Sequence, residues 1–470
     1  MTYPNPGDVL ADLVIRNARL VLPEGIIRGE LAVEKGRISE IAASGLSKAD
    51  REIDAKERIV MPGVIDSHVH LYDPRHPFRE DFQNGSAAAA AGGITSVIVT
   101  PLDTSMLTPK MIKNIIEFGQ RESVIDFDLH AGKMTADSIK DIPKLATLGI
   151  KSFKAFTCAL YRIEDPVLEK LMAAIKNIGG IVFVHAEDDK VLQKRTERLL
   201  KEGRRDPLAH AESCPNEAEE KAIQKVIMLA KRTGCKLHLA HITTRQGIEL
   251  VKKAKDKRMP VTSEICPHYL LFTREDMQRL GPYLKVNPAL KTSEECEALW
   301  NALARGIIDI VSSDHAPRTK AEKEVGWENI WTAQVGVPSV ETLLPLMLSE
   351  GVAKGRLTFE RLVDALCTKP AQIFGLYPRK GAISEGSDAD LVIVDLKKEA
   401  TITAEKMHYK VGWTPYEGMR IKGVPVMTIL RGIVVAENGD VVGKPGYGQF
   451  LTKQKPTRDS AFASPLPTRP

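Results

Sequence analysis

The chain has 470 residues, of which 43% are hydrophobic and 27% are charged, a composition typical of soluble globular proteins with room for several domains. Basic residues outnumber acidic ones by 66 to 61, and the last 20 residues alone hold four basic residues and one acidic residue. With no basic block and only 5% aromatic residues, the sequence predicts no nucleic-acid partner. No stretch approaches the roughly 18 unbroken apolar residues of a membrane helix, so we expect no membrane partner either.

The cysteines and the N-terminus predict a cytoplasmic protein. The six cysteines contain no C-x-x-C pair, which argues against a structural zinc knuckle and against a disulfide framework. The N-terminal residues lack a basic segment followed by an apolar segment and a small-residue cleavage site, so no export signal is visible. A reducing compartment fits both features.

Both ends of the chain alternate short β-branched runs with turn signals. Such runs occupy residues 13–21, 30–41 and 51–63, and they return at residues 388–396 and 424–440. The simplest interpretation is one small β-sandwich domain assembled from residues 1–60 and 379–450. The residues after it, 451–470, are rich in Pro, Ser, Thr and Lys and are expected to form a flexible tail.

Between these ends, residues 61–378 alternate apolar β-rich runs with amphipathic helical stretches. The predicted strands are residues 60–71, 94–102, 125–133, 149–157, 180–188, 236–244, 260–269 and 307–317. Predicted helices between them include residues 110–121, 165–179 and 217–234. Eight such units favour an α/β fold of the (β/α)₈ barrel type over an open doubly wound sheet. No G-x-G-x-x-G follows the first strand and no P-loop is present, so a nucleotide-binding sheet is the weaker alternative.

Potential metal ligands gather at the C-terminal ends of these predicted strands, where barrel enzymes carry their chemistry. They are His68, His70, Lys154, His185, His241 and Asp314. A single strand histidine is usually a satisfied core residue, and His130, His238 and His268 fit that description. Strand alternation also predicts opposite faces for His238 and His241. The coincidence of four histidines and one aspartate at the same end nevertheless predicts a metal site.

Lys154 lies inside an apolar strand, where an unpaired ammonium is costly to bury. One interpretation is a structural lysine that reaches the barrel rim or pairs with a carboxylate. The other is that burial lowers its pKa, so that the neutral amine takes up carbon dioxide. The resulting carbamate is a bidentate ligand that can bridge two cations.

In chain order, the sequence contains PGVIDSHVH, SFKAF, FVHAED, LAHITT, SEICPHYL, KVNPAL and SSDHAP. This ordered set resembles the cyclic amidohydrolases, the family of hydantoinases and dihydropyrimidinases, allantoinases and dihydroorotases. The resemblance covers nearly the whole chain, including the β domain built from both ends. It implies a homodimer or homotetramer that opens a ring C–N bond of a small cyclic amide or imide.

The resemblance also implies two zinc ions and no organic cofactor. One ion would be held by His68, His70, Lys154 and Asp314. The other would be held by Lys154 as a carbamate, His185 and His241. A hydroxide bridging the ions would attack the ring carbonyl, with Asp314 as general base and then general acid.

Dihydroorotases differ from this chain at two positions, the first of which grips the substrate carboxylate. They place an arginine two residues after H-x-H, where this chain has Tyr72, and a histidine where it has Arg318. These differences disfavour a dihydroorotase, although Arg75, Arg79 or Arg318 are alternative carboxylate contacts.

Dihydropyrimidinases and many D-selective hydantoinases place a tyrosine five residues after the bridging lysine. That position is Ala159 here, and Tyr161 lies two residues further. The segments GPYLKV, GWENIW, KGRLTFERLV and VMTILRGIVVAENG resemble bacterial hydantoinases most, so we expect a hydantoin-like ring, with allantoin or dihydroorotate as alternatives. Asn287 and main-chain groups near Gly336 are the candidate contacts to the ring amide.

Two other classes of protein share this fold. A scaffold homologue that has lost its metal would lack ligands, whereas all six ligand residues are present here. A deaminase of the wider superfamily commonly uses one metal and has no bridging lysine, so Lys154 argues against that activity.

Overall fold

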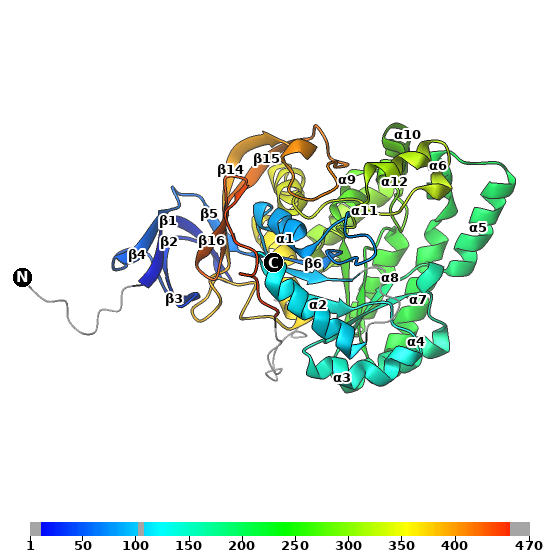
Figure 1. Ribbon diagram of the computed structural model, residues 1–470, viewed down its shortest axis with the longest axis horizontal. Helices are drawn as coiled ribbons and strands as arrows, with labels where there is room; N and C mark the ends of the chain where they lie inside the picture. The colour runs from blue at the N-terminus through cyan, green and yellow to red at the C-terminus, as the bar shows by residue number, and fades with distance from the viewer. Residues whose placement is uncertain (1–10, 102–107, 452–470) are drawn as a thin grey trace, which may run out of the picture.

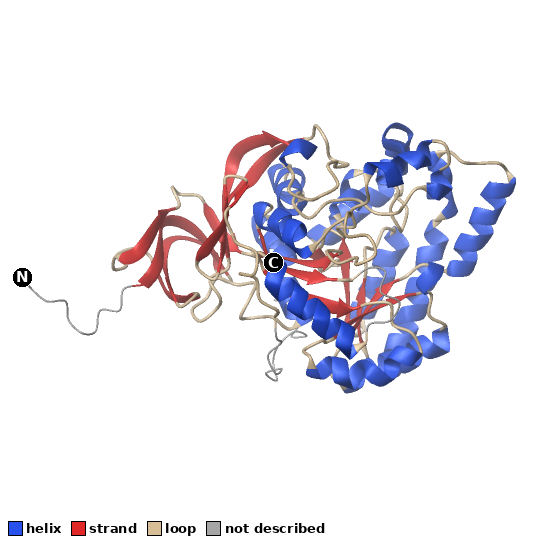
Figure 2. Ribbon diagram, viewed as in Figure 1, coloured by secondary structure: helices blue, strands red, loops and turns tan. Residues whose placement is uncertain are grey.

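The computed structural model describes residues 11–101 and 108–451, which form a helix-covered barrel beside a β-sheet domain (Figure 1). Most helices surround the barrel strands, whereas the sheet domain at the left of the view consists mainly of strands (Figure 2). Within the described ranges, no helix combines the length and the hydropathy needed to cross a bilayer.

Eight parallel strands form the barrel sheet, and each is hydrogen-bonded to the next in chain order. They are β6 (Val64–Val69), β7 (Ile94–Val99), β8 (Asp126–Ala131), β9 (Ser152–Phe156), β10 (Ile181–His185), β11 (Lys236–Leu239), β12 (Val261–Ile265) and β13 (Ile310–Val311). Each lies within one of the eight predicted runs. The predicted (β/α)₈ barrel is therefore confirmed.

The ring of strands closes where the first strand meets the segment after the last. His70 N–H donates to the carbonyl of His315 at 2.9 Å, and Val69 and His315 form an isolated parallel bridge. This closure brings the ends of β6 and β13 together. Residues that are about 245 positions apart in sequence thus become neighbours.

Helices cover the outside of the barrel and lie mainly between its strands. The α-helices are α1 (Phe82–Ala91), α2 (Pro109–Glu122), α3 (Ile142–Thr147), α4 (Asp165–Asn177), α5 (Asp189–Lys201), α6 (Pro207–Ser213), α7 (Asn216–Thr233), α8 (Arg245–Asp256), α9 (Pro267–Leu271), α10 (Met277–Leu280), α11 (Ser293–Ala304), α12 (Lys320–Glu324), α13 (Leu343–Leu346), α14 (Phe359–Val363) and α15 (Lys369–Phe374). The 3₁₀ helices are η1 (Asp137–Asp141), η2 (Ala159–Tyr161), η3 (Arg274–Asp276), η4 (Gly281–Leu284), η5 (Val325–Trp327), η6 (Ile330–Thr332) and η9 (Ala404–Lys406). The π-helices are η7 (Met347–Ala353) and η8 (Asp364–Thr368).

Local sequence signals explain where the predicted helices begin and end. Thr108 caps α2 by accepting from the N–H of Met111 at 3.3 Å, and Pro109 occupies the first helical position, where no N–H is needed. Helix α7 ends at Gly234, whose φ of 69° lies in the left-handed region that glycine adopts without strain. The three predicted helices correspond to α2, α4 and α7.

Nine strands from both chain ends join in one further sheet. They are β1 (Ala11–Leu22), β2 (Gly25–Glu34), β3 (Arg37–Ala42), β4 (Ala49–Asp54), β5 (Ile59–Pro62), β14 (Leu391–Thr401), β15 (Arg420–Leu430), β16 (Ile433–Glu437) and β17 (Asp440–Val441). The two ends meet where β5 pairs antiparallel with β14. A sheet domain built from both ends of the chain is thus confirmed, while its division from the barrel at residues 60 and 379 stays a prediction.

The C-terminal residues of the described chain return to the barrel. Phe127 N–H donates to the carbonyl of Gln449 at 2.9 Å, and Leu451 N–H donates to the carbonyl of Phe127 at 2.8 Å. The Leu451 side chain is fully buried in a cluster with Ile65 and Leu376. Leu451 therefore belongs to the barrel packing and not to the predicted tail, because Phe127 pairs with it on the edge of β8. The rest of that tail, 452–470, lies outside the described residues.

Candidate metal centre

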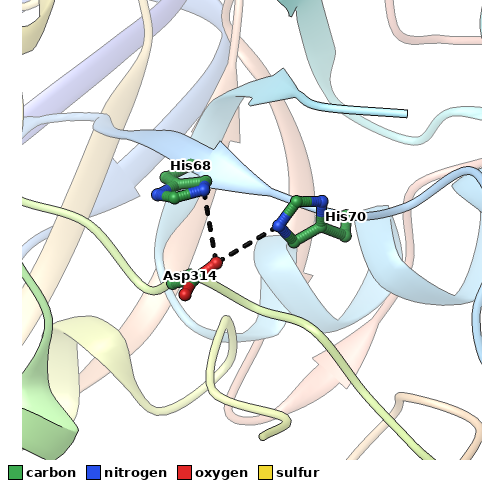
Figure 3. Close-up of side chains that lie close together, drawn as sticks. All are labelled: His68, His70 and Asp314. Carbon is green, nitrogen blue, oxygen red and sulfur yellow. Dashed lines mark hydrogen bonds and ion pairs between the residues drawn. The ribbon is translucent and has the colours of Figure 1, made fainter. Parts of the chain in front are cut away.

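His68, His70 and Asp314 meet at the closure of the barrel, with both histidine rings directed at the carboxylate (Figure 3). His68 Nε2 lies 3.3 Å from Asp314 Oδ1, and His70 Nε2 lies 3.2 Å from the same oxygen. His68 belongs to β6, His70 follows it, and Asp314 follows β13 with a left-handed φ of 47°. The closure of the strands, more than the spacing of residues, brings these groups together.

The opposite nitrogen of each of these two rings is held by a hydrogen-bond acceptor. His68 Nδ1 donates to Glu264 Oε1 at 2.6 Å, and His70 Nδ1 donates to the carbonyl of Thr100 at 2.9 Å. With Nδ1 as the donor, Nε2 of each neutral ring would be left as the atom that binds a cation beside Asp314. Such partners fix the tautomer and the orientation of metal-binding histidines.

Lys154 extends from β9 into the same space. Its Nζ donates to His68 Nε2 at 3.3 Å and lies 3.5 Å from the centroid of the Phe183 ring. The side chain is buried, and within the described part of the chain it forms no salt bridge with a carboxylate. Burial lowers the pKa of Lys154 to about 8, despite the opposing charges of Glu264 and Asp314. A neutral amine is therefore accessible near physiological pH.

His185 and His241 form the second half of the cluster. His185 Nδ1 lies 3.0 Å from His241 Nε2, and His185 Nε2 donates to Glu187 Oε2 at 2.9 Å. The His241 ring stacks on that of His68 with a centroid distance of 5.7 Å, which connects the two halves. Burial and the neighbouring His185 hold the pKa of His241 well below its ordinary range, so this imidazole is neutral.

The donor set fits divalent cations. Neutral imidazole nitrogens and a carboxylate are the ligands that zinc and similar metals prefer. Burial opposes ionisation of Asp314, but His68 and His70 hold the pKa of its carboxyl far below the ordinary value. The buried Nδ1 of His241 has no hydrogen-bond partner among the described residues. The six predicted ligand residues thus lie close together, with Lys154 and His241 next to His68 and with His185 next to His241.

Three other histidines differ in their surroundings. His130 contacts Ser152 Oγ at 2.6 Å and the carbonyl of Ser67 at 2.8 Å, as expected for a satisfied core residue. Both ring nitrogens of the buried His268 lack a partner among the described residues.

His238 lies inside the barrel, on the same side as His241. Its Nε2 lies 3.4 Å from Glu264 Oε2, the carboxylate that also holds His68. The prediction that His238 and His241 face opposite sides was therefore wrong. Strand alternation does not apply, because His241 lies beyond the end of β11 with a φ of 29°.

The two predicted substrate contacts differ in the hydrogen-bonding capacity that the protein leaves unused. Asn287, in the cis Asn287–Pro288 peptide, has a buried Oδ1 with no partner in the described structure. The N–H of Gly336 donates to the carbonyl of Lys285 at 3.0 Å, and the carbonyl of Gly336 accepts from Lys323 Nζ at 3.0 Å. The backbone of Gly336 is therefore already held by protein groups, although its carbonyl retains a second lone pair.

Tyr72, which stands where dihydroorotases carry an arginine, and Arg79 are both in contact with other side chains. Tyr72 packs against the rings of Phe82 and Phe118. Arg79, a possible carboxylate contact, is engaged with Asp73 at 2.9 Å and with Glu322 at 2.5 Å.

The loop after β9 differs from the family pattern as expected. Ala159 adopts a left-handed φ of 60°, and the ring of Tyr161 lies 5.6 Å from that of Phe156. The Phe156 ring in turn lies 5.6 Å from that of His185. Tyr161 is therefore linked to His185 through the ring of Phe156.

Sequence reasoning missed the two carboxylates that hold the histidines, Glu187 and Glu264. Both are buried, at 1% and 0% exposure. A carboxylate inside an apolar strand, as in VTSEI, is itself a signal, because a buried charge needs a partner. Glu187 also follows His185 by two residues in FVHAED.

Comparison with known proteins gives the family of this chain. The model of the amidohydrolase family matches residues 59–435. An L-hydantoinase from Paenarthrobacter aurescens is 37% identical over 94% of this chain and 98% of its own length. A D-hydantoinase from Geobacillus stearothermophilus is 34% identical over 94% and 96%. Proteins named allantoinase and dihydroorotase also match at 34% identity.

The fold is shared with solved structures as well. The structure of an L-hydantoinase (dihydropyrimidinase) from Arthrobacter aurescens superposes with a TM-score of 0.92 at 36% identity, covering 94% of this chain and all of that one. The chain therefore belongs to the amidohydrolase family of hydrolases.

Proposed function

We propose that this enzyme opens the ring amide bond of a hydantoin-like substrate with the help of two zinc ions. The observation that supports the proposal is the proximity of six side chains from five barrel strands or the segments that follow them, with His68, His70 and Asp314 in one group and Lys154, His241 and His185 beside it. His68, His70, Asp314 and Lys154 as an N-carboxylated side chain would hold one ion. The same Lys154, His185 and His241 would hold the other. When bound, the ions would activate water and polarise the carbonyl under attack.

Lys154 is suited to carboxylation by its position. Its Nζ lies next to His68 Nε2 and has no carboxylate partner within the described residues, so the proposed bridging anion would replace an unpaired buried cation. The burial that lowers its pKa to about 8 also supplies the neutral amine that the reaction with carbon dioxide needs.

Asp314 is the proposed proton carrier. Its carboxylate is ionised and lies beside both Nε2 atoms of the H-x-H pair, so it can accept a proton from the attacking water and pass it to the leaving ring nitrogen. The adjacent His315 is less suited to this role. Its Nδ1 accepts from the N–H groups of Ser339 and Val340, and its Nε2 donates to Glu80 Oε2 at 3.2 Å.

Contacts to the ring favour a hydantoin over dihydroorotate. The free Oδ1 of Asn287 would accept from a ring N–H, and the second lone pair of the Gly336 carbonyl would assist. Dihydroorotate carries a carboxylate that needs a cation, and Arg79 is already committed to Asp73 and Glu322. The similarity to an L-hydantoinase at 37% identity supports the same choice.

The proposal also includes the cellular compartment and the oligomeric state of the enzyme. All six cysteines are free and buried, which suits a reducing cytoplasm. We further propose a homodimer or homotetramer, the assembly that the family resemblance implies.

The test is a ring-opening screen of zinc-loaded enzyme prepared with bicarbonate. Its substrates are hydantoin, both enantiomers of 5-substituted hydantoins, allantoin, dihydrouracil and dihydroorotate. Carbamoyl product should form from hydantoins, disappear after treatment with a chelator, and return with zinc. Turnover of allantoin or dihydroorotate without turnover of any hydantoin would overturn the substrate, and activity unaffected by chelation would overturn the metal.

A further inference from the structure

The buried side chain of Lys323 donates to three backbone carbonyls. Lys323 belongs to α12 and is 0% exposed. Its Nζ donates to the carbonyl of Lys285 at 3.1 Å, to that of Gln334 at 2.9 Å and to that of Gly336 at 3.0 Å. An ammonium group has three protons to donate, so these three carbonyls use the full capacity of the side chain.

Backbone carbonyls, and not a carboxylate, compensate the burial of this amine. Within the described part of the chain, Lys323 forms no ion pair with an acidic side chain. Burial and the charges of Arg318 and Lys285 lower the pKa of Lys323 well below its ordinary range. The carbonyls oppose this effect, because only the ammonium form donates three hydrogen bonds. An amine buried at such a cost points to a role in holding these backbone segments.

The three carbonyls belong to the two segments that carry the proposed ring contacts. Lys285 stands two residues before Asn287, whereas Gln334 and Gly336 belong to the loop after α12. The N–H of Gly336 also donates to the carbonyl of Lys285 at 3.0 Å. One carbonyl therefore accepts from both Lys323 and Gly336, and it joins the two segments.

Two further contacts hold the Gly336 segment in place. Lys285 Nζ donates to the carbonyls of Ile330 and Ala333, each at 2.7 Å. Gly336 has a φ of 122°, and a side chain at this position would meet the carbonyl oxygen of Ala316. The Gly336 backbone is thus packed closely against the segment that follows β13.

We propose that Lys323 is a positioning residue that fixes the separation between Asn287 and Gly336, and that it thereby sets the affinity of the enzyme for the ring. The proposal rests on the proposed function, in which these two residues contact the ring amide. Since the three protons of Nζ are engaged with carbonyls, Lys323 acts on the ring only through the backbone. Contacts of this kind hold the ring in the ground state and in the transition state alike, so their misalignment raises KM more than it lowers kcat.

The first experiment is steady-state kinetics of zinc-loaded Lys323→Met with the hydantoin that the wild-type enzyme opens. Methionine has a similar length but no N–H donor. We expect KM to rise about 10-fold or more while kcat stays within about 3-fold of wild type, with the zinc content unchanged.

Lys151→Met is the matched control. Lys151 Nζ also donates to a backbone carbonyl, that of Ile178, at 3.0 Å. It directly precedes β9, away from the strand ends that carry the predicted ligands. Its KM should equal that of wild type.

A double-mutant cycle with Asn287→Ala separates positioning from a general loss of stability. Asn287→Ala should raise KM by itself. If Lys323 acts through Asn287, the KM of the double variant should lie within about 2-fold of that of Lys323→Met, whereas independent effects multiply. Multiplied effects, a wild-type KM in either single variant, or a fall in kcat alone would each overturn the proposal.

Two further measurements cover the case in which Lys323→Met does not fold. Lys323→Gln keeps two N–H donors on a shorter side chain, and its KM should exceed that of wild type at an unchanged kcat. In the wild-type enzyme without substrate, the amide hydrogens of Gln334 and Gly336 should exchange slowly, because they donate to the carbonyls of Glu322 and Lys285. A wild-type KM in Lys323→Gln or rapid exchange of these amides would overturn the proposal.

The proposed function fails separately, since it is tested by zinc-dependent ring opening in the wild-type enzyme. If another ring is opened, the same kinetics use that ring. If no ring is opened, amide exchange still decides whether the Gly336 segment is held before a substrate binds.

Discussion

The Nδ1 atom of His68 donates to Oε1 of Glu264 across 2.6 Å, linking the first and seventh strands of the barrel. The other oxygen of Glu264 lies 3.4 Å from His238 Nε2, so one buried carboxylate serves two rings. This contact leaves Nε2 of His68 as the lone pair that faces Asp314 and Lys154. Glu264 is therefore a positioning residue for the proposed zinc centre.

We expect Glu264→Gln to weaken zinc binding by about 10–100-fold, the usual effect of losing such a partner. The amide keeps the size of the side chain but removes the charge that favours a donating Nδ1. Zinc affinity is measured by competition with a chelator at fixed pH. Glu52→Gln, an exposed partner of Arg16 in the sheet domain, is the control. Equal affinity in both variants would show that Glu264 does not position His68.

Asp314→Asn should lower kcat by roughly 10³ or more while part of the metal is retained. Asparagine keeps one oxygen near His68 and His70 but takes up no proton at neutral pH, and general acid–base catalysis is worth about 10²–10⁴ in rate. Steady-state kinetics and metal analysis of the same sample separate the two effects. A near-normal kcat would show that another group carries the proton, and the adjacent His315 is the alternative.

Lys154 should make the stability of the metal-free protein depend on pH. Its folded pKa of about 8 lies below the ordinary 10.5, so between these values the unfolded chain binds more protons and stability rises with pH. This lowering of the pKa corresponds to about 3 kcal/mol. We expect the free energy of unfolding of wild type, minus that of Lys154→Met, to increase above about pH 8 in bicarbonate-free buffer. A flat difference would mean that Lys154 is not desolvated.

Residues 449–451 should contribute to the stability of the barrel. Ending the chain after Gly448 removes two backbone hydrogen bonds to Phe127 and the buried side chain of Leu451. We expect a loss of about 2–4 kcal/mol relative to a chain that ends after Leu451. Chemical denaturation of the two proteins measures the difference, and equal midpoints would exclude a structural role for this segment.

Much of the fold follows from local patterns in the sequence. Eight apolar runs predict eight strands, and each observed strand lies within its run, because the alternation of strands and helices is a short-range property of side-chain chemistry. The barrel rule then places the ends of these strands at one face. That rule is why His68, Lys154 and His185 could be named as one group from the sequence alone.

The tertiary structure decided which groups complete the site. Glu264 holds His68 because β12 and β6 lie on either side of β13 in the closed barrel. His238 shares that carboxylate on the same side as His241, although strand alternation predicted opposite sides for the two histidines. His241 and Asp314 lie beyond strand ends with left-handed backbone conformations, where no periodic rule directs a side chain.

The surroundings of Cys158 and Leu451 also depend on the tertiary structure and do not follow from the sequence alone. Cys158 lies beside Glu187 because two loops are tied together through Thr157, and Leu451 is buried because Phe127 offers free backbone groups on the edge of β8. Short-range patterns determined the strands, their order and the ligands at their ends. Contacts between distant segments depend on barrel closure and loop conformation, which are decided only when the whole chain packs.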